Sequence, residues 1–128
     1  FIDLELVGIG DRLAFLENEG ILRPRTISPA VRKQVQAAAQ RLVERNAEGE
    51  ESGSLPNLQP VRGALCGVFT EMNIAWEQGF HGVCLTVGSS VDGSLPQWHR
   101  LTDIPKNFQE SAFACTHALV WELLQVND

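Results

Sequence analysis

The segment from Pro60 to Trp76 constrains the fold of this chain most, because its apolar residues favour a helix with little surface left for water. At 100° per residue, the larger apolar side chains form one wide face: Val61, Ala64, Leu65, Val68, Phe69, Met72, Ala75 and Trp76. A second flank is lined by Gly63, Gly67, Thr70 and Ile74. A helix that is apolar on two sides is buried. We therefore expect a helix over 60–78 around which the other elements pack.

The N-terminal part predicts a first helix over 3–19. Apolar residues recur there at helical spacing, and Gly20 suits the C-terminal cap: Ile2, Leu6, Ile9, Leu13 and Leu16. Gly8 and Gly10 oppose this helix, because each costs about 1 kcal/mol in a helix interior. A short strand over Ile2 to Val7 is the alternative.

Ser28-Pro29 predicts the start of a second helix, over 29–46. Ser28 can accept a hydrogen bond from an early backbone N–H, and proline suits the first helical position. Val31, Val35, Ala38 and Leu42 then form a narrow seam, so the helix should lie on the surface. The segment from Ala47 to Ser54 has no large apolar side chain, and we expect a mobile loop at about 47–54.

Beyond Gly79 the pattern alternates, which is typical of a strand. Val83, Leu85 and Val87 share one side, and Asp92-Gly93 favours a two-residue hairpin turn. We therefore predict an antiparallel hairpin over 82–102, in which Val87 pairs with Trp98 and Leu85 with Arg100. Pro96 makes the return strand an edge.

The last predicted helix covers 106–126. Its main apolar stripe, which Phe113, Val120 and Leu124 widen, should pack directly on the helix at 60–78, with close approach at Gly63 and Gly67. The stripe comprises Phe108, Ala112, Cys115, Leu119, Leu123 and Val126. The predicted fold class is thus mainly α (α+β): a four-helix core with one β-hairpin inserted before the C-terminal helix, in a single domain over 1–128.

The bulk composition limits the partners. The chain of 128 residues has a net charge of −6, which opposes nucleic acid or an anionic membrane as the main partner. Its basic residues between Arg23 and Arg45 form no stripe, so we interpret them as ordinary surface charge. No apolar run approaches the length of a membrane span. Three widely spaced cysteines favour reduced thiols and a cytoplasmic protein.

Histidine and cysteine spacing predicts neither a metal site nor a cofactor. His81 and Cys84 would point to opposite faces of a strand, and Cys115 and His117 do not face each other on a helix. His99 would lie diagonally across the hairpin from Cys84, within reach of its thiol. Nucleophilic catalysis needs this proximity, and also a third group that orients the imidazole and a pocket that excludes water. A semi-buried cysteine beside a surface histidine is the commoner arrangement, and no phosphate-binding or nucleophile motif supports catalysis.

Tryptophan supplies the remaining functional signal. Trp98 lies on the predicted edge strand, and Trp121 lies on the less apolar side of the last helix with His117. Tryptophan is enriched at interfaces because it buries much area and keeps one polar group. The sequence therefore predicts a small acidic binding module, without catalysis, that forms a homodimer or binds another protein.

The alternative function is a small-molecule-binding protein or small enzyme with a pocket between the hairpin and the helices. The candidate residues for partner or ligand binding are Trp98, His99, Cys84, Trp121 and His117. A helical DNA-binding protein with a wing-like hairpin is a third possibility, which the negative charge opposes.

Overall fold

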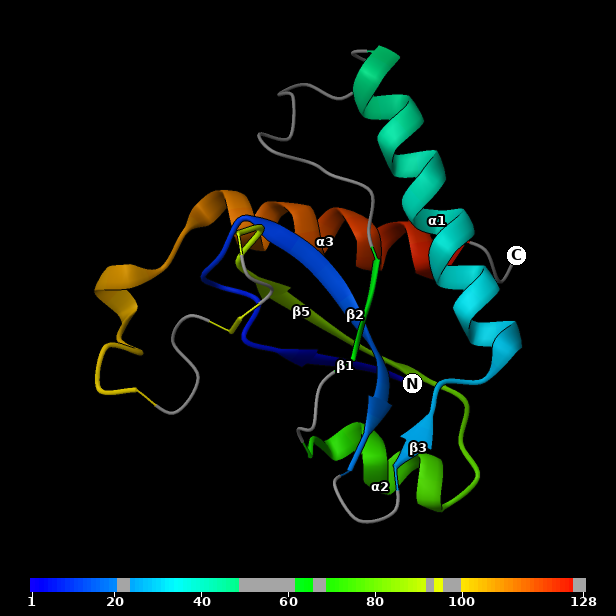
Figure 1. Cartoon of the computed structure of the whole chain (residues 1–128). Helices are drawn as coiled ribbons and strands as arrows, with labels where there is room; N and C mark the ends of the chain where they lie inside the picture. Colours follow the sequence, from blue (N-terminus) through cyan, green and yellow to red (C-terminus); the bar gives the residue numbers. More distant parts are fainter. Residues whose placement is uncertain (21–23, 49–61, 66–68, 92–93, 96–99, 126–128) are drawn as a thin grey trace.

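A computed structural model shows an α+β fold in which helices cover both faces of a mixed sheet (Figure 1). The structure describes residues 1–20, 24–48, 62–65, 69–91, 94–95 and 100–125. The strands are β1 (Ile2–Glu5), β2 (Arg12–Glu19), β3 (Arg25–Thr26), β4 (Arg62–Leu65) and β5 (Val83–Gly88). The helices are α1 (Pro29–Glu48), α2 (Glu71–Glu77) and α3 (Glu110–Gln125), with a 3₁₀ turn over Pro105–Asn107.

The sheet is built around β5, which has a hydrogen-bonded strand on each edge. The strand order is β1-β5-β2-β3, and β4 also pairs with β2. β1 runs parallel to β5, with Leu4 opposite Leu85, whereas β2 runs antiparallel, with Phe15 opposite Leu85. All residues of β5 are buried.

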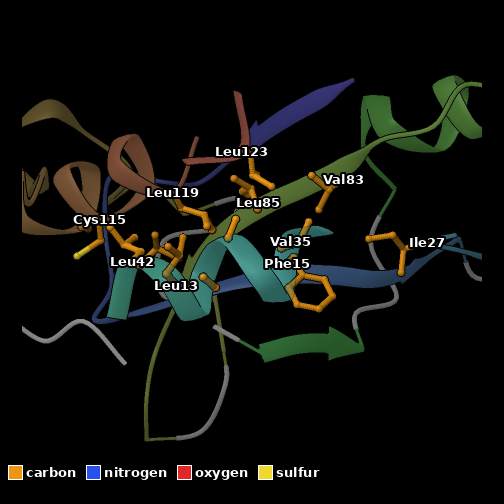
Figure 2. Packing of buried hydrophobic residues seen from close by; sticks show 14 residues of the cluster. Leu13, Phe15, Ile27, Val35, Leu42, Val83, Leu85, Cys115, Leu119 and Leu123 are labelled. Carbon is orange, nitrogen blue, oxygen red and sulfur yellow. The ribbon is translucent and has the colours of Figure 1, made fainter. Parts of the chain in front are cut away.

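The main hydrophobic core lies between the sheet and the pair α1 and α3 (Figure 2). Alternate residues of β2 and β5 point to this side because strand side chains alternate between faces. The buried residues of this core include Leu13, Phe15, Val35, Leu42, Val83, Leu85, Val87, Cys115, Leu119 and Leu123. The opposite face holds a smaller core, made of Leu16, Met72, Ala75 and Cys84, under α2.

Helix α2 is fixed to β2 by buried polar contacts at its start. Thr70 caps the helix, because its side-chain oxygen accepts a hydrogen bond from the Met72 N–H. The Thr70 backbone N–H and hydroxyl both donate to the buried carboxylate of Glu19, at 3.0 and 2.7 Å. A buried carboxylate is expensive unless it is hydrogen-bonded, so this contact fixes where α2 begins.

The predicted four-helix core with one hairpin is wrong. The segment 60–78 contains β4 and the short helix α2, which are separated by 66–70, and of these 66–68 lie outside the described part. A short apolar run does not distinguish a buried strand from a buried helix, and the cap at Thr70 marks the true helix start. The predicted packing of this segment on the last helix is wrong as well, because α2 and α3 lie on opposite faces of the sheet.

The predicted first helix, 3–19, is instead the two strands β1 and β2, and the alternative strand near 2–7 is confirmed. The chain turns between them at Gly10, which has φ +136°. A Cβ atom at this position would lie 2.6 Å from the carbonyl oxygen of Gly88. Glycine is therefore required here for both conformation and close approach.

The predicted hairpin fails because β5 has no free edge at Leu85, which pairs with β1 and β2 instead of with Arg100. A turn follows β5, since the Ser89 N–H donates to the Ser94 carbonyl. The predicted return strand, with Trp98 and His99, lies largely outside the described residues, and Leu101 is fully exposed.

Two helix predictions are confirmed. α1 begins at Pro29 after Ser28, whose side chain accepts a hydrogen bond from Val31, and Val35, Ala38 and Leu42 are buried as expected. α3 lies within the predicted range 106–126. Most of the predicted loop at 47–54 lies outside the described residues, whereas Ala47 belongs to α1.

A buried carboxylate joins α1 to α3. Glu122 of α3 is 3% exposed and lies 2.8 Å from the Arg45 guanidinium and 3.7 Å from that of Arg41. Both arginines keep part of their surface in water. The carboxylate thus compensates two charges at the contact between the helices.

We predict that Glu122→Gln lowers the free energy of unfolding by about 2 kcal/mol, because it leaves the two guanidinium groups without their buried partner. The neighbouring change Glu110→Gln, at an exposed position of α3, should cost about 0.5 kcal/mol at most. Urea unfolding followed by circular dichroism measures both. Equal stabilities of the two variants would contradict a structural role for Glu122.

Candidate functional site

The helix α3 has two chemically different faces. Its inner face, with Ala112, Cys115, Leu119 and Leu123, is buried against the sheet and α1. Its outer face exposes Phe113, His117, Trp121 and Leu124, which we call the outer stripe. Their spacing of three or four residues places them on one side of the helix. The outer stripe is therefore a continuous surface along α3.

The outer stripe exposes much apolar area. The exposed fractions are 46% for Phe113, 58% for Trp121 and 55% for Leu124. Phe108 extends the stripe, since its ring centroid lies 5.8 Å from that of Phe113 and the residue is half exposed. Single exposed apolar residues are common on proteins, but contiguous apolar patches mark binding surfaces.

The outer stripe also lacks charge. Within α3, the described exposed residues include one charged side chain, Glu110, at the first position. The other carboxylate of the helix, Glu122, points inward to Arg41 and Arg45. The chain as a whole has 20% charged residues and a net charge of −6.

The predicted site residues do not form one group. His117 and Trp121 lie together on the outer stripe, whereas Cys84 is buried on the face of the sheet that α2 covers. Trp98 and His99 lie outside the described residues. Burial raises the pKa of the Cys84 thiol far above its usual range, and the carboxylates of Asp3 and Glu19 raise it further. A thiol in this environment stays protonated and is a poor nucleophile.

A group of carboxylates that was not predicted from the sequence lies at the edge of the sheet face that α2 covers. Asp3 and Glu5 of β1 and Glu71 of α2 have carboxylate oxygens within 4.8 Å of one another. The Asp3-x-Glu5 spacing could have indicated it, because residues two apart on a strand share a face. Hard cations such as Ca²⁺ or Mg²⁺ prefer oxygen ligands, so these residues could hold one.

Comparison with protein-family models, with curated proteins and with solved structures finds no match. Within the described part of the chain, no helix combines the length and the apolar character needed to cross a bilayer.

The carboxylate group makes a prediction about pH. Burial, then the neighbouring carboxylates Asp3 and Glu71, raises the pKa of Glu5 above its ordinary 4.5. The folded state therefore binds the proton more tightly than the unfolded chain does, and stability falls as pH rises through this window. We expect Glu5→Gln to be more stable than the wild type at pH 7, by about 0.5 kcal/mol.

Urea unfolding in EDTA, at pH 7 and again near the ordinary pKa of 4.5, tests this prediction. The advantage of Glu5→Gln should shrink at the lower pH, where the wild-type carboxyl is protonated. Glu44→Gln is the control, because Glu44 is exposed on α1 and its hydrogen bond from Gln40 can be kept by an amide. If Glu5→Gln is less stable than the wild type at pH 7, the ionised Glu5 carboxylate does not destabilise the fold, and the prediction is wrong.

Proposed function

We propose that this protein is a non-catalytic protein-binding module that acts as a homodimer through the outer stripe of α3. The observation that carries the proposal is the exposure of Phe113, Trp121 and Leu124 on one uncharged helix face. Aromatic side chains are enriched in the centres of interfaces, where charged residues are depleted. The outer stripe has both properties.

A second copy is the partner that fits this surface best. The chain carries a net charge of −6, so two copies repel each other where their acidic residues approach. An interface without charged residues avoids this repulsion. The outer stripe offers such a region. A basic partner would instead be expected to contact an acidic surface.

The spacing of the outer stripe is also self-complementary. Phe113 and Trp121 lie four residues before and after His117, which is about 6 Å along the helix in each direction. In an antiparallel pair of α3 helices with a two-fold axis near His117, Phe113 meets the partner's Trp121 and the reverse contact follows by symmetry. The surface is modest, so we expect a dissociation constant on the order of micromolar.

We place this dimer in the cytoplasm. Cys84 is a buried thiol outside any disulfide, and reduced thiols are typical of cytosolic proteins.

Sedimentation velocity of the wild type at micromolar concentration and above tests the dimer. The expected mass is twice the 14.1 kDa of one chain. Trp121→Glu should shift the protein to the monomer, because it places a charge in the centre of the interface. Phe80→Glu is the matched control, since Phe80 is 64% exposed and lies just after α2, away from α3. A wild-type monomer throughout would refute the proposal.

A separate prediction concerns Trp121→Ala. We expect it to weaken association about 30-fold, as the loss of about 2 kcal/mol at an interface centre does. Its effect on the unfolding of the monomer should stay below about 1 kcal/mol, because the side chain is exposed there. Dilution calorimetry and urea unfolding at low protein concentration measure the two effects. If Trp121→Ala destabilises the monomer more than it weakens association, Trp121 stabilises the monomer and not the dimer.

A further inference from the structure

A pocket of ≈ 260 Å³ lies beside the end of β5, where Val87 forms part of its lining. It is a half-open pocket lined by the connection from β1 to β2, by the end of β5 and by the segment that leads into α3. The described residues that line it are Leu6, Gly8, Ile9, Val87, Leu95, Asp103, Ile104, Pro105 and Phe108. All but Asp103 are apolar or glycine, which is the usual character of a small-molecule site.

Hydrogen bonds hold two walls of the pocket together. The Gln109 N–H donates to the Gly8 carbonyl at 2.8 Å, and the Gln109 side-chain oxygen accepts from the Gly10 N–H at 3.0 Å. The Phe108 ring packs on the backbone of Gly8, where an added Cβ would lie 2.9 Å from the ring. The pocket is thus a built feature of the fold rather than a gap between independent loops.

The backbone at the pocket is strained. Leu6 has φ +55°, the one positive φ among the described residues other than glycine. This conformation costs a leucine roughly 1–2 kcal/mol. Strained residues cluster at ligand-binding sites, where the surrounding structure holds them. Here the strained residue is part of the pocket lining.

Asp103 gives the pocket its polarity. It is the one ionisable side chain among the described lining residues, and none of the ion pairs among the described residues includes it. Arg100 and Lys106, its exposed neighbours in the chain, are absent from those ion pairs too. A carboxylate at an otherwise apolar pocket favours a ligand with an apolar body and a cationic group.

We propose that this pocket binds a small apolar amine, with its hydrocarbon part against Leu6, Ile104 and Phe108 and its ammonium group on Asp103. A cavity of about 150 Å³ holds benzene in another protein. A pocket of ≈ 260 Å³ therefore suits a ring or an alkyl chain of about six to eight carbons. This site is separate from the proposed dimer, apart from Phe108, which borders both surfaces.

Three probes of equal length test the proposal: hexylamine, hexanol and hexanoate, titrated into ¹⁵N-labelled protein at neutral pH. Hexylamine should shift the backbone resonances of the lining residues, with a dissociation constant on the order of 0.1–1 mM. Hexanol should bind about fivefold more weakly and hexanoate more weakly still. Binding of hexanoate as tight as that of hexylamine, or no shift at these residues with any probe, would overturn the proposal.

Two variants test the roles proposed for Asp103 and Ile104 in binding the amine. Asp103→Asn should remove the preference for hexylamine over hexanol, and Ile104→Trp should weaken all probes at least fivefold by filling the pocket. Both positions are exposed, so the fold should tolerate the changes. Leu101→Trp, at a fully exposed position outside the described lining, is the control and should bind hexylamine as the wild type does.

Monomeric Trp121→Glu should also bind hexylamine normally, which separates this proposal from the dimer. Unchanged binding in Ile104→Trp, or an unchanged preference in Asp103→Asn, would place the amine elsewhere and refute the site.

Discussion

The burial of β5 is the constraint on which the rest of the structure depends. Its neighbours β1 and β2 satisfy the backbone groups on its two edges, and its side chains are buried on both faces. A strand without a solvent-facing side needs a cover for each face. α1 and α3 supply one cover, and α2, with the capped start at Thr70, supplies the other.

α3 shows how one element serves both folding and recognition. Its inner residues complete the core, and the inward orientation of Glu122 keeps a charge off the outer surface. The carboxylates of Asp3, Glu5 and Glu71 gather on the opposite layer of the molecule. The apolar and the acidic surfaces are thus separated by the sheet, so each can have its own partner.

Local signals in the sequence were sufficient to predict an element whose structure depends mainly on its own residues. The Ser28-Pro29 cap and the seam of α1 are of this kind, and so is the alternation at Val83, Leu85 and Val87. The segment 60–78 was misinterpreted because strand and helix both accept a short apolar run, and tertiary pairing with β2 selects the strand. Pairing partners far apart in the chain leave no local signal.

The candidate surface was partly predictable for the same reason. The helical wheel assigns Trp121 and His117 to the less apolar side of α3, where the structure exposes them. The same wheel assigns Phe113 and Leu124 to a widened core stripe, yet they are half exposed. α3 rests on the sheet and α1 along one seam, so its apolar surface exceeds what these neighbours cover. How much of α3 its neighbours cover depends on the assembled fold and cannot be predicted from the helix alone.

The parallel pairing of β1 with β5 has a consequence for how the chain folds. The amino group of Phe1 donates to the His81 carbonyl across 80 residues, and Ile2 pairs with Val83. Because β5 follows most of the chain, β1 has no partner until β2, α1 and α2 have been synthesised. Closing so long a loop is entropically costly and slows folding. β2, β3 and β4 precede β5 and can pair with one another earlier, so the pairing of β1 is the part of the sheet that must wait for β5.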